Sequence, residues 1–160
     1  MSSLSSKVPE DAYLLSRTDA LHPLAAFSRH AFELDGDTWP SVEHYFQAMK
    51  FRDRRIREAI RDAPHPRLAQ KIARRRFWKI RRDWKKLRRV LMTRATYIKC
   101  LTHPEVRDEL LATGELTIVE NSLYDHYWGC GRDQRGNNYF GKMLMDVRNR
   151  LREEKARQAV

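Results

Sequence analysis

Apolar residues recur at helical spacing over most of the chain, and the clearest example begins near residue 41. Val42, Tyr45, Phe46 and Met49 stand at i, i+3, i+4 and i+7, so they share one face of a helix. The serine that directly precedes this stripe is a residue type that favours the N-cap position. The pattern therefore predicts a helix over residues 41–51.

Five further helices are predicted from the same periodicity and from boundary residues. They cover residues 53–62, 66–75, 83–101, 104–113 and 138–154. Pro66 stands at the start of the second of these, Asp83 at the cap of the third, and Gly114 directly after the fourth. Phe77 and Trp78 lie among arginines and lysines, and we expect both rings to enter the core.

Strand-like patterns are confined to two short stretches. Apolar residues flank a glycine turn at residues 35–37, which predicts a hairpin over residues 31–39, and a further strand is predicted over residues 116–120. A polar and aromatic loop follows over residues 121–137. We therefore predict a mainly α fold with a minor β part, a single compact helical domain that is helical over more than about 45% of its length.

Length and composition place the chain among ordinary globular proteins. It has 160 residues, of which 41% are hydrophobic and 33% charged, and this composition argues against disorder and fibrous repeats. No apolar run approaches the roughly 18 residues of a membrane span, and the first residues lack the apolar core of a secretory signal. We expect one domain over residues 11–155, a flexible tail at 1–10, a further tail at 156–160, and no membrane partner.

Cysteine usage bears on the cellular compartment. The two cysteines, Cys100 and Cys130, form neither a disulfide framework nor the spacing of a zinc site. We therefore expect a cytoplasmic protein with free thiols, without a bound metal and without a cofactor.

Positive charge is concentrated in one stretch. The net charge is +11, yet residues 52–89 alone carry 17 basic and 4 acidic residues, a local charge of +13. Such a block attracts phosphate-bearing partners in a salt-dependent way. A solvated basic helix surface explains the same charge, so the block does not by itself identify a binding site.

Glu43, Gln47 and Lys50 form a polar row beside the apolar stripe of the predicted 41–51 helix. Their spacing of i, i+4 and i+7 puts the three side chains within about 40° of one another around the helix axis. Such a row is either a surface charge ladder, worth a few tenths of a kcal/mol, or one wall of a polar site. His44, in the first turn, either contacts a ligand or donates to a backbone carbonyl.

The loop over residues 121–137 gathers residue types that are common at nucleotide sites. It contains Asp125, His126, Trp128, Gly129, Gly131 and Gly136. Glycine allows the backbone to approach a ligand closely, and an indole ring can stack on a base. Turn formation explains the glycines equally well, and His126 is most simply a surface residue.

Together these segments resemble a known family. The first matching motif is Leu34-Asp-Gly-Asp-Thr-Trp-Pro-Ser-Val-Glu-His-Tyr-Phe-Gln-Ala-Met-Lys-Phe51. The later ones are Arg82-Asp-Trp84, Thr113-Gly114 with Val119-Glu120, Asp125 to Gly131, and Asn138 to Arg148. In this order the motifs resemble the NADAR superfamily, and within it the YbiA-like N-glycosidases, over roughly residues 13–152. The chain departs from the family at Leu24-Ala-Ala-Phe27, where a Leu-Ser-Asn-Phe segment is usual.

The resemblance implies an enzyme that hydrolyses the bond between C1 of a phosphorylated ribose and the exocyclic amine of a base. The implied substrates are phosphoribosylated pyrimidine intermediates of riboflavin synthesis, or nucleic acid that carries ADP-ribose on guanine. A lysine attacks C1 and forms a Schiff base, or the bond breaks through an oxocarbenium-like state beside a carboxylate. Both routes need a carboxylate and a proton donor near C1.

The resemblance also implies roles for individual residues. Glu43 and Lys50 are expected to act at C1, with Asp125 as the next catalytic candidate, and these three are expected to line one pocket together with Gln47 and Trp128. Contacts to the substrate are expected from His44, Gln47, Arg82, Trp128, Gly129, Gly131, Asn138, Gly141 and Lys142. Among these, Arg82 and the N-terminus of the last helix would receive phosphate.

A second class of function remains open from the residues alone. A non-enzymatic module could bind nucleic acid or ADP-ribose through the basic surface, and it would leave the polar row and the 121–137 loop unused. The expected partners are therefore a nucleotide-derived small molecule or ADP-ribosylated nucleic acid.

Overall fold

The computed structural model describes residues 8–160, so most of the tail expected at residues 1–10 lies outside the described part. The elements in chain order are β1 (Tyr13–Leu15), β2 (Phe32–Leu34), β3 (Asp37–Trp39), α1 (Val42–Ala48), α2 (Arg54–Arg61), α3 (Pro66–Arg75), the 3₁₀ turn η1 (Phe77–Lys79), α4 (Trp84–Thr102), α5 (Pro104–Ala112), β4 (Ile118–Glu120) and α6 (Tyr139–Gln158). About half of the described residues are helical, which confirms the predicted mainly α fold.

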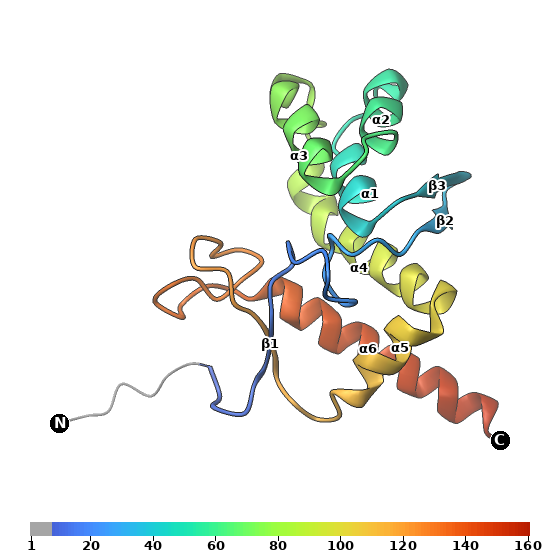
Figure 1. Ribbon diagram of the computed structural model, residues 1–160, viewed down its shortest axis with the longest axis vertical. Coiled ribbons are helices and arrows are strands. Elements are labelled where there is room, and N and C mark those ends of the chain that lie inside the picture. The colour runs from blue at the N-terminus through green and yellow to red at the C-terminus, as the bar shows by residue number, and fades with distance from the viewer. Residues whose placement is uncertain (1–7) are drawn as a thin grey trace.

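The helices form two groups that α4 connects. Helices α1, α2 and α3 contact one another at one end of the molecule, beside the β2–β3 hairpin (Figure 1). Helix α4 runs from this group to α5, and α6 packs against both α4 and α5. In this way α4 contacts elements at both ends of the fold.

The strands form two small sheets. One joins neighbouring strands, and the other joins strands that are far apart in the sequence. Strands β2 and β3 pair antiparallel in the predicted hairpin, with Phe32 opposite Trp39. Strand β1, which the sequence analysis did not predict, pairs parallel with β4 and sets Tyr13 opposite Ile118. This second sheet brings the N-terminal region beside the loop that follows β4.

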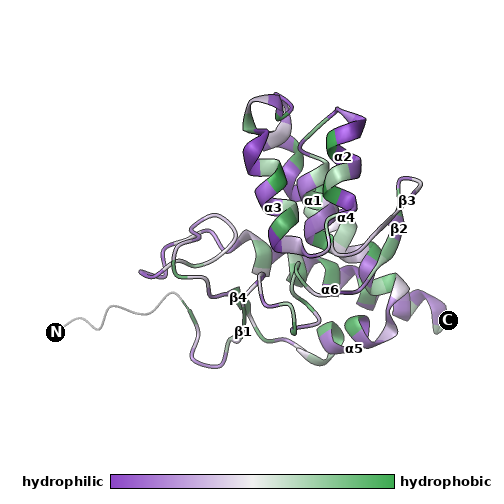
Figure 2. Ribbon diagram, turned by 45° about the horizontal axis from the view of Figure 1, so that its top comes forward, coloured by the Kyte–Doolittle hydropathy of each residue, from purple (hydrophilic) through white to green (hydrophobic). Residues whose placement is uncertain are grey.

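Helix α1 lies at the centre of the core. All seven of its residues are buried, because α2, α3 and α4 all contact it. Helices α2 and α3 alternate hydrophilic and hydrophobic positions, as expected for helices with one exposed face (Figure 2). No helix among residues 8–160 combines the length and apolarity that crossing a membrane requires.

Several boundary predictions are confirmed by local contacts. The Ser41 hydroxyl accepts the backbone N–H of His44 at 3.2 Å, so it caps α1 as predicted. Gly114 follows α5 with a φ of +60°, a conformation that glycine adopts without strain. Asp83 occupies the N-cap position of α4, but Arg81 binds its carboxylate at 2.6 Å, and the side chain makes no capping bond.

The prediction that Phe77 and Trp78 enter the core is wrong. Their side chains are 68% and 60% exposed, and the two rings contact each other edge to face. The 3₁₀ turn after α3 changes the direction of the chain at this point, so the helical phase that would bury these rings is not continued.

Two helix ends also differ from the prediction. Helix α6 continues to Gln158, so most of the tail expected at residues 156–160 is helical. Helix α1 ends at Ala48 rather than at residue 51. The reason is tertiary: the Lys50 carbonyl accepts the backbone N–H of Arg81 at 2.8 Å, and the Phe51 carbonyl accepts the Arg57 side chain at 2.5 Å. Lys50 therefore lies in the turn after α1.

Candidate active site

Arg17 is the centre of a cluster of acidic side chains. It lies after β1, and its guanidinium is 3.4 Å from Glu43 of α1 and 3.3 Å from Asp125 of the loop after β4. A third carboxylate, that of Glu120 at the end of β4, lies 4.0 Å away. The structure thus brings together Glu43 and Asp125, as the sequence analysis expected, through an arginine that the analysis missed.

The Glu43 carboxylate is fully buried and held by three donors. Gln47 Nε2 donates to Oε1 at 2.7 Å, and Gln70 Nε2 of α3 donates to the same oxygen at 3.0 Å. Arg17 approaches the other oxygen, Oε2. Because donors hold both oxygens, the orientation of the carboxylate is fixed.

Lys50 lies beside this cluster with its ammonium over an aromatic wall. Its Nζ is 5.7 Å from the centre of the Phe46 ring and 6.0 Å from that of Trp84. Burial lowers the pKa of Lys50, and the nearby charges of Arg17, Arg74 and Arg88 lower it further, while Glu43 raises it. A lysine with a lowered pKa is more often a neutral amine, which is the nucleophilic form.

Gln47 carries an unused acceptor within the same site. Its side chain is 6% exposed, and its Nε2 is committed to Glu43. Its Oε1 is buried and accepts no hydrogen bond from any residue of the described chain. Buried polar atoms without a partner are uncommon in folded proteins, so Gln47 Oε1 is suited to accept a hydrogen bond from a ligand.

Glu120 is a further buried carboxylate that the candidate residues did not include. Ser122 binds it through its backbone N–H at 2.5 Å and its hydroxyl at 2.9 Å. Burial raises the pKa of Glu120. Gly129 packs directly against it, because a Cβ on Gly129 would lie 3.2 Å from Glu120 Oε1 and 2.8 Å from the Asp125 carbonyl. Gly129 therefore allows the loop to approach the carboxylates.

Trp128 belongs to the aromatic wall. Its side chain is 6% exposed, and its ring packs edge to face on Phe46 with centroids 5.5 Å apart. Phe46 also contacts Trp84 at 4.9 Å. Trp128 therefore lies near Lys50, and most of its surface is covered by the protein.

His44, for which the sequence analysis left open a ligand contact or a backbone hydrogen bond, makes the backbone hydrogen bond, and both of its ring nitrogens have protein partners. Nδ1 bonds with the Ser41 hydroxyl at 2.7 Å, and Nε2 bonds with the Ala63 carbonyl at 2.9 Å. Burial lowers the pKa of this histidine. Its contacts attach α1 to the turn between α2 and α3.

Four other candidates make no contact with Arg17 and have contacts of their own within the protein. A Cβ on Gly131 would lie 2.3 Å from the His126 ring. The Asn138 amide binds the backbone of β4, donating to the Ile118 carbonyl at 2.9 Å and accepting Glu120 N–H at 2.8 Å. Gly141 lets α6 approach the Ile118 carbonyl, and Lys142 is exposed, with its Nζ 5.2 Å from the centre of the Tyr139 ring. The contacts of Asn138 and Gly141 fasten α6 to β4.

Arg82 is the last candidate, and it is exposed. It makes no ion pair or hydrogen bond with any other described residue. Its neighbour Arg81 is paired with Asp83.

Arg17 and Glu120 were not among the candidate site residues, and the sequence offers a signal for only one of them. Glu120 ends an apolar strand, a place where an acidic residue is notable, whereas Arg17 lies in an irregular stretch without periodicity.

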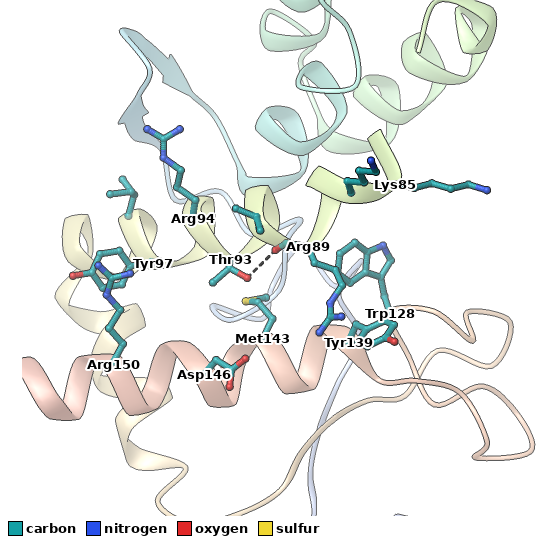
Figure 3. A pocket seen from close by; sticks show the side chains of 13 residues that line it. Lys85, Arg89, Thr93, Arg94, Tyr97, Trp128, Tyr139, Met143, Asp146 and Arg150 are labelled. Atoms are coloured by element: carbon teal, nitrogen blue, oxygen red, sulfur yellow. Dashed lines mark hydrogen bonds between the residues drawn. The ribbon is translucent and has the colours of Figure 1, made fainter. Parts of the chain in front are cut away.

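A large groove lies between α4 and α6, and Trp128 is among the residues that line it. It has a volume of about 810 Å³ and is lined by the basic side chains of Lys85, Lys86, Arg89, Arg94 and Arg150, with Asp146 as its acidic residue. Arg89 lies over Tyr139 at 3.9 Å and Arg150 over Tyr97 at 4.2 Å, so the two helices contribute stacked cation and ring pairs (Figure 3). Trp128 lines this groove and also packs on Phe46 beside Lys50.

Comparison with known proteins places the chain in a family. The chain is 38% identical over 140 residues to the N-glycosidase YbiA of Escherichia coli, which covers 88% of both chains. The NMR structure of the E. coli protein YbiA superimposes with a TM-score of 0.81 at 35% identity, covering 96% of this chain and 92% of that one.

Two further relatives extend the comparison. An N-glycosidase of Nostoc punctiforme is 40% identical over 129 residues, covering 79% of this chain and 83% of its own. A riboflavin biosynthesis protein of Vibrio vulnificus is 37% identical over 130 residues, which cover 81% of this chain but only 35% of that protein. The family model of the NADAR domain matches residues 8–152. The chain therefore belongs to the NADAR domain family.

Proposed function

We propose that this protein is an N-glycosidase that cleaves the bond between C1 of a phosphorylated ribose and the exocyclic amine of a base. Relatives named N-glycosidase support the reaction type. The observation that carries the proposal is the position of Lys50, a lysine with a lowered pKa beside a fixed, buried carboxylate. That combination supplies a nucleophile and a proton-transfer group at one place.

The chemistry follows from the charge balance of the reacting centre. The exocyclic amine donates its lone pair to C1, the bond from C1 to the ring oxygen breaks, and that oxygen takes up a proton. The neutral amine of Lys50 then bonds to C1 of the resulting iminium and loses a proton. The base leaves after its nitrogen is protonated, so that a Schiff base joins C1 to Lys50. Water adds to this Schiff base and releases the ribose phosphate and the free lysine.

Glu43 is assigned the proton transfers in this sequence. Its Oε2 faces Arg17, while its Oε1 accepts the two glutamine amides, so the carboxylate cannot rotate away. A fixed carboxylate near C1 also stabilises the positive charge that develops on the sugar. Gln47 Oε1, which lacks a protein partner in the described chain, is assigned a ribose hydroxyl as its donor. Asp125, on the other side of Arg17, is assigned the attacking water or a second hydroxyl.

The test is a side-by-side assay of the purified protein on a phosphoribosylamino-pyrimidine and on DNA with ADP-ribosylated guanine. Turnover of either compound is the expected result. Borohydride added during turnover should reduce the Schiff base, and peptide mapping should find the added mass on the peptide that contains Lys50. Absence of turnover on both compounds would overturn the proposal.

The groove between α4 and α6 supports a larger, nucleic-acid-linked substrate. Five basic side chains and one acidic side chain line it, and Trp128 connects it to the surroundings of Lys50. A strand continuing from a ribosylated base would therefore find cations for its phosphates next to the reacting centre. The small riboflavin intermediates do not need this surface.

A pair of charge variants separates these substrates. Replacing Lys85, Lys86 and Arg89 with glutamine should reduce turnover on DNA much more than on the free phosphoribosyl compound, and should flatten the salt dependence. The matched control replaces the exposed Arg55, Lys71 and Arg75 of α2 and α3. Equal losses in both variants would assign the effect to net charge. Binding of DNA without turnover would favour a non-enzymatic binding module.

A further inference from the structure

A second lysine, Lys99 of α4, is buried where no acidic partner neutralises it. Its side chain is 1% exposed, and its Nζ donates to the Ala25 carbonyl at 2.9 Å and to the Ser28 hydroxyl at 2.5 Å. Within residues 8–160 no carboxylate forms an ion pair with it. Removing an ammonium group from water is costly, so this arrangement calls for a function.

The segment that Lys99 binds is attached to both central residues of the Arg17 cluster. The Ala26 carbonyl accepts the backbone N–H of Glu43 at 3.0 Å. The next residue, Phe27, donates its backbone N–H to the Arg17 carbonyl at 3.1 Å. Lys99 binds the residues on either side of this pair, Ala25 and Ser28.

These contacts form a continuous path from α4 to the site. Arg17 lies in a turn after β1 and Glu43 in the first turn of α1, and their side chains meet at 3.4 Å. Residues 25–28 are themselves irregular, so neither a helix nor a strand sets their conformation. We infer that Lys99 is a positioning residue, which fixes residues 25–28 and through them the distance between Arg17 and Glu43.

The effect of Lys99 on catalysis rests on the proposed function. Lys99 acts through residues 25–28 and does not itself touch the substrate. Its Nζ is occupied by the Ala25 carbonyl and the Ser28 hydroxyl, whereas Lys50 is partly exposed. Burial lowers the pKa of Lys99 to about 7. The titratable groups whose charges couple to it are His22, His30 and Cys100. A neutral amine keeps two N–H donors, which is the number that Ala25 and Ser28 accept.

The test compares Lys99→Met with Met92→Ala. Met92 is a fully buried residue on the same helix, so its truncation lowers stability without removing the hydrogen bonds that Lys99 makes to residues 25–28. At a temperature where both variants are folded, Lys99→Met should lower kcat on the order of 10-fold with little change in KM. Met92→Ala should keep the wild-type kcat.

Hydrogen exchange gives a readout that does not depend on turnover. In Lys99→Met the amides of Phe27 and Glu43 should exchange faster than in the wild type, while amides within α6 keep their rates. Ser28→Ala, which removes one of the two acceptors, should show a smaller change at the same two amides. If Lys99→Met does not fold, the exchange rates in Ser28→Ala test the positioning role instead.

Two results would overturn the inference. One is a wild-type kcat in Lys99→Met, and the other is an equal fall of kcat in Met92→Ala. If the wild type turns over neither substrate, the proposed function fails by itself. Unchanged exchange at Phe27 and Glu43 in both Lys99→Met and Ser28→Ala would then reject the positioning role separately.

Discussion

The surroundings of Lys50 and of Lys99 show how two lysines with lowered pKa values come to differ in role. Burial is the main cause of the lowered pKa in both cases. Lys50 remains partly exposed in a turn beside Glu43, whereas Lys99 lies inside the fold, where a carbonyl and a hydroxyl accept its N–H groups. A lowered pKa therefore does not by itself identify a nucleophilic lysine. The exposure of the amine and the presence of a carboxylate beside it separate Lys50 from Lys99.

The first way to test this comparison is Lys50→Arg, for which we expect the largest effect. A guanidinium stays protonated and cannot attack C1, so the rate should fall by at least about 10³-fold and the borohydride adduct should disappear. Circular dichroism would confirm that the variant is folded. An adduct that persists in this variant and maps to Lys99 would reverse the roles given to the two lysines.

Glu43→Gln tests the role of the carboxylate that lies near Lys50 and has no counterpart near Lys99. We expect the rate to fall by about 10²-fold or more, because a neutral amide cannot transfer a proton. Glu43 raises the pKa of Lys50, so its loss should shift the titration of Lys50 to lower pH. The shift is measurable as the pH dependence of acylation at Lys50. A rate close to the wild type would make Glu43 a structural residue.

The third prediction concerns stability and pH. The pKa of Lys99 is about 7 in the folded protein and 10.5 in its ordinary state, so between these values the unfolded chain binds more protons. The unfolding free energy of the wild type relative to Lys99→Met should therefore rise with pH over this window, by up to about 1.4 kcal/mol per pH unit. Below pH 7 the difference should be constant.

Urea denaturation of both proteins at several pH values measures this difference. Lys50→Met is the matched comparison, since Lys50 is partly exposed and should give a weaker dependence. A difference that stays constant from pH 7 to pH 10 would show that Lys99 keeps its charge in the folded protein.

The smallest effect is expected at a third lysine, Lys142. It is exposed at the start of α6, and its side chain lies over the Tyr139 ring. Lys142→Gln should change turnover by less than about twofold, because surface substitutions outside such contacts usually have small effects. A loss on both substrates would show that the N-terminus of α6 does bind phosphate.

The helical part of the fold was predictable because apolar periodicity and boundary residues act locally. The Ser41 cap of α1 and the turn at Gly114 are examples, since each depends on a few neighbouring residues. The end of α1 was not predictable in this way, because a backbone bond from Arg81 to Lys50 ends the helix early. The position of Phe77 and Trp78 was missed for a similar reason, at a turn that interrupts the pattern.

The site was predictable only in part. Glu43 and Gln47 share a helix face, so their spacing was informative, and the structure keeps them 2.7 Å apart. Arg17 was not predictable, because its role depends on the pairing of β1 with β4, which joins strands about a hundred residues apart. His44 was assigned to substrate although both of its nitrogens bind the protein.

The parallel pairing of β1 with β4 also determines when the site can form during synthesis. Arg17 and Asp125 are separated by 108 residues, and both β4 and the following loop must leave the ribosome before they meet. A nascent chain that ends at α5 already contains Arg17, Glu43, Lys50 and Lys99, but it lacks the loop carboxylate. Lys50 and Glu43 are thus synthesised before the complete set of acidic groups exists, and the part of the chain that follows α5 supplies Asp125 as well as α6.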